Sequence, residues 1–119
     1  HNEGDNLIKT AAGLLSGTRI SGASCEKNFR IGGDEFVKAA YGDITQQGID
    51  EFRREIGEKV NITNSTSGKP YPIYMPIGTC LRSPGDIPDC DKMLSSADEA
   101  MYADKIRLKS VTGFDPKRK

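Results

Sequence analysis

The spacing of apolar residues along the chain predicts three amphipathic helices. In residues 6–15 the apolar positions recur every three or four residues, and Ser16-Gly17 ends this pattern with a turn signal. Residues 47–59 repeat the pattern, with charged side chains on the opposite face. Residues 91–109 contain a third run, whose apolar side chains can face a sheet. Each helix therefore offers one apolar face for packing.

Two short segments with alternating apolar residues predict a β-hairpin. Its arms are residues 27–31 and 35–40, and the glycine pair at 32–33 lies between them. Glycine reaches the positive-φ conformations that tight primed turns require, so this pair favours a turn. The tip also carries Asp34 and Glu35. These acids either solvate the tip or form a site, and the tip residues by themselves leave both alternatives open.

A third strand is expected over residues 71–81, which are rich in β-branched and aromatic side chains. Pro72 and Pro76 each remove a ladder donor, so part of this strand is expected to be irregular or to lie at an edge. The polar residues 61–70 before it predict a loop. The order helix, strand, strand, helix, strand, helix predicts an α/β (α+β) fold, a two-layer sandwich in which helices cover an antiparallel or mixed sheet.

Composition narrows the class of protein. At 119 residues the chain has the length of one domain. Its 17 basic and 17 acidic residues balance, so no overall positive field points to nucleic acid or an anionic membrane, and a small partner is expected. No apolar run is long enough to span a membrane, and no segment resembles a signal peptide. Because Cys25, Cys80 and Cys90 are widely spaced and odd in number, free thiols in a soluble, cytoplasmic protein are expected.

Three segments together resemble one known family. They are HNEGD at residues 1–5, GGDEF at residues 32–36 and SSADEAMYADK at residues 95–105. In these segments, and over essentially its whole length, the chain is similar to the catalytic domain of diguanylate cyclases, the GGDEF family. The resemblance implies the palm-like fold of nucleotidyl cyclases, with a ferredoxin-like core. It also implies a bacterial signalling reaction in which two GTP molecules, one on each of two facing copies of the domain, condense to cyclic di-GMP.

The resemblance assigns roles to the residues of the hairpin. Asp34 is expected to ligate Mg²⁺ or Mn²⁺ and to help deprotonate the attacking ribose hydroxyl, with Glu35 as its acidic neighbour at the metal. Gly32 and Gly33 are expected to let phosphate approach the backbone closely. Arg30 is expected to pin the strand by pairing with a carboxylate.

The other two segments are assigned to guanine recognition and phosphate binding. Asp5 matches the family aspartate that accepts hydrogen bonds from guanine, and the alternative for it is an N-cap of the first helix. His1 matches the histidine of the same segment, and the alternative is a terminal histidine without a role. Lys105 matches the lysine that reaches the triphosphate. Lys109 stands where the family usually has an arginine, so it keeps the charge and loses the bidentate fork.

The chain also departs from the family pattern. Residues 23–26 match the product-inhibition motif in position but not in sequence, and Arg19 lies too far upstream to complete it, so feedback through that site is not expected. Pro76-Ile77-Gly78 stands where the family often has Ser-Ile-Gly. Packing and helix positioning, rather than chemistry, are expected of three residues of the last helix, Asp98, Met101 and Tyr102.

The largest departure concerns the front of the domain. Family domains begin with a strand that carries a metal-ligating aspartate and an asparagine that shares guanine recognition, and this sequence contains neither. Residues 1–119 are therefore interpreted as a single GGDEF domain without its N-terminal strand and helix, not competent in this form. The parent protein is expected to carry an upstream sensor or regulatory module and can be membrane-anchored. The alternative is a degenerate domain that binds GTP or a protein partner and regulates a neighbour without turnover.

Overall fold

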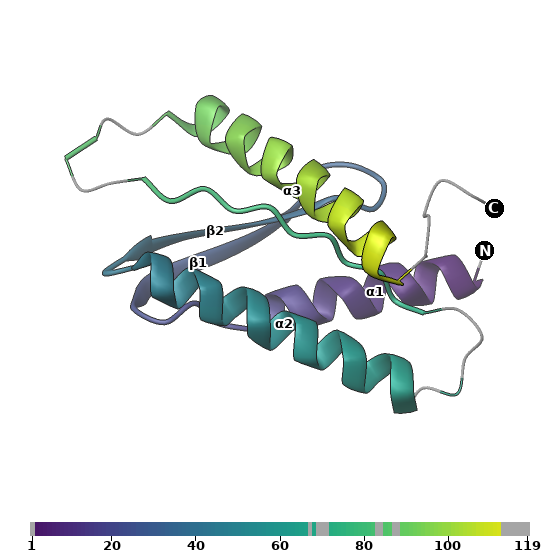
Figure 1. Ribbon diagram of the computed structural model, residues 1–119. Helices are drawn as coiled ribbons and strands as arrows, with labels where there is room; N and C mark the ends of the chain where they lie inside the picture. The colour runs from purple at the N-terminus through teal and green to yellow at the C-terminus, as the bar shows by residue number, and fades with distance from the viewer. Residues whose placement is uncertain (1, 67, 69–71, 83–84, 87–88, 113–119) are drawn as a thin grey trace. The chain divides into compact units, whose positions relative to one another are not determined.

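The structure is a computed structural model, and it describes residues 2–66, 68, 72–82, 85–86 and 89–112. The chain forms two compact units, His1–Ile73 and Tyr74–Lys119. The first unit holds four elements: α1 (Asn2–Gly17), β1 (Ala23–Arg30), β2 (Phe36–Gly42) and α2 (Gln46–Thr66). The second holds α3 (Cys90–Thr112). These helices and the antiparallel strand pair confirm the predicted mixed α+β fold class (Figure 1).

All three predicted helices form, and each extends beyond its predicted bounds. α1 begins at Asn2, so Glu3 and Asp5 fall in its first turns, where negative charge is favourable. α2 continues to Thr66 instead of giving way to a loop, so the predicted loop is wrong for residues 61–66. The hydroxyls of the last two helical residues donate to helix carbonyls four residues earlier, which satisfies them without ending the helix.

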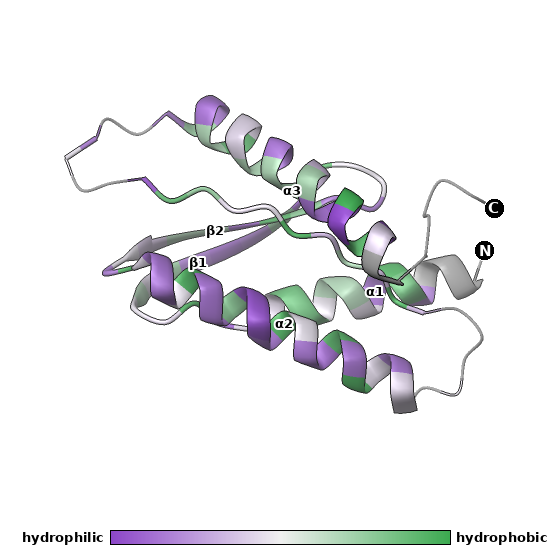
Figure 2. Ribbon diagram, viewed as in Figure 1, coloured by the Kyte–Doolittle hydropathy of each residue, from purple (hydrophilic) through white to green (hydrophobic). Residues whose placement is uncertain are grey.

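The core of the first unit is built on α2. Ile49, Phe52 and Ile56 are buried and share one face, as their spacing predicts. α1 packs against both α2 and β2. Figure 2 shows hydrophilic and hydrophobic residues interspersed along α2, as expected of an amphipathic helix.

A hydrogen-bonded link joins the end of α1 to α2. Thr18 is fully buried, and its hydroxyl donates to the Leu14 carbonyl at 2.7 Å. The Lys59 ammonium of α2 donates to the same hydroxyl at 2.7 Å. Because a buried hydroxyl without partners is costly, these bonds make Thr18 a specific packing position.

The predicted hairpin is confirmed, and its open end depends on glycine. β1 and β2 pair antiparallel, from Ala23 opposite Gly42 to Arg30 opposite Phe36. Gly22 and Gly42 have φ angles of 86° and 146°. A Cβ at Gly22 would overlap the carbonyl oxygen of Asp43, and one at Gly42 would collide with the facing backbone. The fold therefore requires these two glycines, where side chains would be strained and would clash.

The predicted third strand does not form within the described residues 72–81. Two of its residues are prolines, which cannot donate to a ladder. The N–H groups of Ile73 and Ile77 donate instead to side chains, to Asn64 Oδ1 at 2.6 Å and to Asp104 Oδ2 at 2.7 Å. Asn64 also donates to the Ile73 carbonyl at 3.1 Å, so its amide pairs with the backbone as a strand would.

Two expectations from composition also meet the structure. Of the helices in the described part of the chain, none has the length and apolar character needed to cross a bilayer. All three cysteines are free thiols, as predicted, with Cys25 and Cys90 exposed and Cys80 partly buried.

A buried ion pair stabilises the hairpin. Glu26 Oε1 lies 2.9 Å from Lys38 Nζ, and the two side chains are only 7% and 3% exposed. The Ile20 N–H donates to Glu26 Oε2 at 2.6 Å, so both carboxylate oxygens are engaged. Burial raises the pKa of the Glu26 carboxyl, but the bond from Ile20 and the Lys38 ammonium outweigh this effect, and the net shift is downward.

Glu26→Gln is expected to destabilise the protein by about 2 kcal/mol at neutral pH, because Lys38 would lose its buried counter-charge. The lowered pKa means that the ionised form stabilises the fold above the unfolded-state pKa, and that this contribution is lost as the pH falls through the folded-state value. The difference in unfolding free energy between wild type and variant should therefore shrink as the pH falls. Denaturant unfolding at a series of pH values measures this difference. The exposed Glu51→Gln is the control. A pH-independent difference would contradict the assignment.

Candidate active site

The acidic tip of the hairpin is exposed to solvent. β1 ends at Arg30 and β2 begins at Phe36. The Ile31 N–H donates to the Glu35 carbonyl at 3.0 Å and closes the turn. All five residues from 31 to 35 are exposed, so the glycine pair and the adjacent acids of the GGDEF segment face solvent.

The two tip glycines are not demanded by the fold. Neither Gly32 nor Gly33 has a positive φ, so the expected reliance on a primed turn is wrong. A Cβ at Gly33 would meet nothing within 4 Å, and one at Gly32 would be in ordinary contact with Glu35. This contrasts with Gly22 and Gly42 at the open end. The bare backbone at the tip therefore leaves open space beside the acids rather than relieving strain.

Arg30 holds the tip through backbone carbonyls. Its Nε donates to Gly33 O at 3.0 Å and to Gly32 O at 3.3 Å, and its Nη2 also donates to Gly33 O. The guanidinium carbon lies 5.9 Å from the centroid of the Phe36 ring, within cation–π range. Arg30 thus pins the hairpin as expected, but the carboxylate partner predicted for it is wrong. Carbonyl dipoles take that place because the chain turns back over the guanidinium.

The direction of these carbonyls orients the next amides. In a planar trans peptide the N–H points away from the preceding C=O, and the structure has no cis peptide among its described residues. The N–H groups of Gly33 and Asp34 therefore point away from Arg30. Within the described residues neither N–H has a hydrogen-bond partner. The tip thus offers two consecutive amide donors to an acceptor such as a phosphate oxygen.

Asp34 and Glu35 supply hard oxygen ligands beside these donors. Mg²⁺ in nucleotide-handling proteins is commonly held by one or two carboxylates, with the substrate phosphates and water completing its shell. Two adjacent exposed carboxylates fit that pattern, and Mn²⁺ accepts the same ligands. Among the described residues, no group of three or more metal-ligating side chains gathers at one point. Asp34 and Glu35 therefore suit a metal shared with substrate rather than a cage made of protein alone.

Of the residues assigned to guanine recognition, the structure describes only the backbone of Asp5. Because α1 begins three residues before Asp5, this residue lies within the helix, and the alternative that it caps the helix is wrong. The helix starts earlier because Asn2, Glu3 and Asp5 are all favourable near a helix N-terminus. The side chain of Asp5 and the whole of His1 lie outside the described residues.

The two lysines assigned to phosphate lie on α3, in the second unit. They are four residues apart and so share one side of the helix. Lys105 is partly buried and Lys109 is exposed. Of the three residues expected to pack there, Met101 is partly buried, whereas Tyr102 is 58% exposed and Asp98 is exposed.

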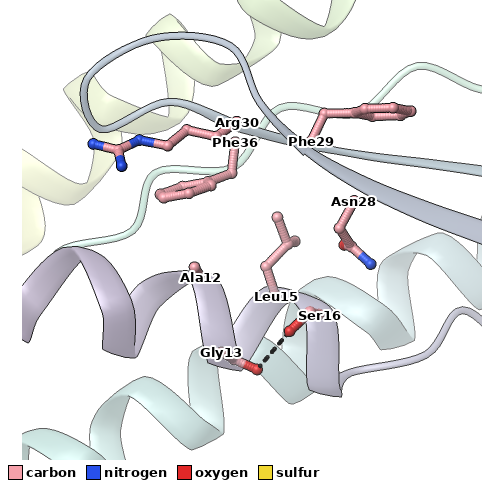
Figure 3. A pocket seen from close by; sticks show the side chains of 8 residues that line it. All are labelled: Ala12, Gly13, Leu15, Ser16, Asn28, Phe29, Arg30 and Phe36. Atoms are coloured by element: carbon pink, nitrogen blue, oxygen red, sulfur yellow. Dashed lines mark hydrogen bonds between the residues drawn. The ribbon is translucent and has the colours of Figure 1, made fainter.

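A shallow cavity of about 290 Å³ lies between α1 and the hairpin (Figure 3). Figure 3 shows Phe36, Leu15 and Ala12 bordering it, together with Arg30 and Asn28 of β1. Ala12 is seven residues beyond Asp5, about 10 Å along a helix. The cavity is thus a mainly apolar groove beneath the Arg30 side of the hairpin and is separate from the guanine-recognition position that the resemblance implies.

Sequence reasoning did not single out Asp104, a buried acid of α3. Asp104 is 6% exposed and binds both a backbone N–H and an arginine. The sequence spacing could have indicated this, because Asp104 lies on the same helical face as Ala97 and Met101. An acid on an apolar face is unfavourable unless it is paired.

Removal of the guanidinium is expected to loosen the tip without unfolding the protein. Arg30→Ala deletes every bond to the two glycine carbonyls, and because Arg30 is exposed the cost in stability should stay below about 1 kcal/mol. Backbone ¹⁵N relaxation should show larger fast motions at Gly33 and Asp34. Arg30→Lys should fall between, and the exposed Lys27→Ala on the same strand is the control. Unchanged tip order in Arg30→Ala would contradict this role.

Comparison with known proteins agrees with the three motifs. The family model described as "Diguanylate cyclase, GGDEF domain" matches residues 1–110. No curated protein and no solved structure matches the chain significantly. The family match covers nearly the whole chain and includes α1, the hairpin tip and all but the last two residues of α3. The chain therefore belongs to the GGDEF family of diguanylate cyclase domains.

Proposed function

We propose that this chain is the catalytic domain of a diguanylate cyclase that condenses two GTP molecules to cyclic di-GMP in a bacterial signalling pathway. One observation carries the proposal. The hairpin tip combines two exposed carboxylates, two outward-pointing amide donors and two glycines that the fold does not need. This combination suits a phosphate group and a divalent cation better than it suits a plain turn.

The residues of the tip match the demands of the reaction. A ribose 3′-hydroxyl of one nucleotide attacks the α-phosphorus of the other, pyrophosphate leaves, and negative charge builds up on the phosphoryl oxygens. The Gly33 and Asp34 amides are proposed to donate to one such oxygen. Asp34 is proposed to take the hydroxyl proton, and Asp34 with Glu35 would hold Mg²⁺ or Mn²⁺. When bound, this ion neutralises phosphate charge.

Recognition of the rest of GTP is proposed for the helices. Asp5 would accept from the guanine N1–H and amino group, which adenine cannot offer, and His1 belongs to the same segment. Lys105 and Lys109 would attract the triphosphate, Lys109 without the bidentate fork of an arginine. Cyclic di-GMP is two-fold symmetric, so a second copy of the same domain would present the second GTP. Such a nucleotide reaction fits a cytoplasmic location.

The edge of β2 supports a further strand in the complete domain. β1 carries four charged or amide side chains, Glu26, Lys27, Asn28 and Arg30, as edge strands do, whereas β2 is mostly apolar. Within the described residues β2 pairs with β1 alone, and an isolated hairpin is marginally stable. We propose that a strand outside this sequence pairs with β2 and adds the missing metal and guanine ligands. We also propose that a sensor or regulatory module precedes it.

The contacts of Glu26 bear on the expectation that product does not inhibit the domain. Glu26 stands at the acidic position of the family motif. Its two carboxylate oxygens accept hydrogen bonds from Lys38 Nζ and from the Ile20 N–H. Its side chain is only 7% exposed. These contacts support the proposal that product does not regulate the domain through this position.

Asp34→Ala is expected to reduce cyclic di-GMP synthesis by the complete protein by at least about 1,000-fold, because it removes both a metal ligand and the proposed proton acceptor. The thermal midpoint should change little, since the side chain is exposed. The matched control is Glu51→Ala, an exposed acid on α2. Unchanged synthesis by Asp34→Ala would contradict the assignment. GTP binding without turnover in the unaltered protein would favour the regulatory module instead.

The 119-residue chain and a longer form that includes the proposed upstream strand are expected to differ sharply in GTP binding and in synthesis. The short chain should bind GTP weakly and make no detectable cyclic di-GMP, whereas the longer form should do both, because the proposed strand adds ligands and covers β2. Calorimetry with GTP and Mg²⁺ and a product assay on both forms provide the comparison. Robust synthesis by the short chain would mean that its metal site is built from other residues.

A further inference from the structure

The segment at residues 74–78 runs antiparallel to α3 at close range. The Tyr74 hydroxyl donates to the Lys105 carbonyl at 2.7 Å, and the Ile77 N–H donates to Asp104 Oδ2 at 2.7 Å. At Gly78 the backbone comes so close that a Cβ would overlap the Ala97 carbonyl oxygen. Three contacts, spread over two helical turns of α3, therefore define how this helix is rotated about its axis.

Asp104 is the polar centre of these contacts. Its side chain is 5% exposed, and its second oxygen, Oδ1, accepts from Arg107 Nε at 3.0 Å and Nη2 at 2.9 Å. Burial of a carboxylate is unfavourable unless it is paired in this way. A rotation of α3 by one residue would turn the carboxylate by about 100°. The hydrogen bond between the Ile77 N–H and Asp104 would then be lost. Asp104 thus selects one rotation of the helix.

This rotation decides where the phosphate-binding lysines point. Lys105 follows Asp104 directly, and Lys109 lies one turn further along the same side. Arg107 is engaged by Asp104, and in the described part of the chain no acidic side chain or carbonyl accepts from the Lys105 ammonium. The Lys105 carbonyl, in turn, is held by Tyr74. The backbone at Lys105 is therefore fixed while its ammonium group is left to a ligand.

We infer that Asp104 is a positioning residue for nucleotide binding: by accepting from the Ile77 N–H it sets the rotation of α3 that directs Lys105 and Lys109 toward the triphosphate. The inference rests on the proposed function and adds to it. Asp104 does not touch the nucleotide. It acts on the phosphate end of the ligand alone, through Lys105 and Lys109. The effect of removing Asp104 on nucleotide affinity therefore depends on whether these lysines are present.

The test uses the complete protein and two probes, a non-hydrolysable GTP analogue with Mg²⁺ and guanosine. Asp104→Ala should lower the affinity for the GTP analogue about tenfold and the affinity for guanosine less than twofold. Only the analogue has phosphate groups, and only phosphate contacts depend on the lysines. Asp104→Asn keeps an oxygen for the Ile77 N–H and should restore most of the affinity. Arg107→Ala, which leaves the bond between Ile77 and Asp104 intact, is the matched control. Its affinity for both probes should stay within about twofold of that of the unaltered protein.

A double-mutant cycle and a spectroscopic signature separate positioning from general damage. In a Lys105→Ala background, Asp104→Ala should cost less affinity than in the unaltered protein, because only Lys109 remains of the two lysines that it positions. Selective ¹⁵N-isoleucine labelling should show the Ile77 amide shifted in Asp104→Ala and near its normal position in Asp104→Asn.

The outcomes distinguish this inference from the proposed function. Equal weakening of both probes, or additive effects of Asp104→Ala and Lys105→Ala, would overturn the positioning role. Loss of affinity in Lys105→Ala with none in Asp104→Ala would overturn it as well and leave the proposed function standing. If the unaltered protein binds no GTP analogue, the proposed function fails, and this inference fails with it.

Discussion

Every backbone N–H and C=O that is removed from water needs a partner, and in this chain side chains supply many of them. The described sheet has two strands, so a ladder can satisfy few groups beyond the hairpin. Outside the helices and the hairpin ladder, single side chains bind backbone groups directly: Glu26 on Ile20, Asn64 on Ile73, Asp104 on Ile77 and, at the exposed tip, Arg30 on the two glycines. Each of these contacts fixes a segment that has no strand beside it.

The same contacts prepare the candidate active site. Arg30 draws the glycine carbonyls inward, and planar peptides then turn the following N–H groups outward. Asp34 and Glu35 are carried on the turn that these bonds hold in shape. In the second unit, Tyr74 donates to the Lys105 carbonyl itself, and Ile77 donates to the side chain of Asp104, the residue before it. Positioning of polar groups before a ligand arrives lowers the ordering cost of binding, which is the role of the residues around a functional site.

Glycines show how differently the two ends of the hairpin are constrained. Gly22 and Gly42 occupy positive-φ conformations in which a Cβ would collide with backbone. Gly32 and Gly33 have neither restriction. A sequence pattern cannot separate these cases, because glycine is compatible with both, and the structure reverses the reason first given for the tip pair. The chain's membership of the GGDEF family accounts for the presence of the glycine pair in the motif, and the fold does not require it.

The sequence by itself determined the three helices, the hairpin, the free cysteines and the family, because these depend on local periodicity and on short motifs. It did not determine the fate of residues 71–81, whose β-rich composition becomes a strand only where a neighbouring strand is present to pair with it. Nor did it determine the pairing of Glu26 with Lys38 or of Asp104 with Ile77, whose members lie 12 and 27 residues apart along the chain. Hydrophobic spacing is a property of adjacent residues, whereas a buried carboxylate is satisfied by whichever donors folding brings to it, and that was decided by the tertiary structure alone.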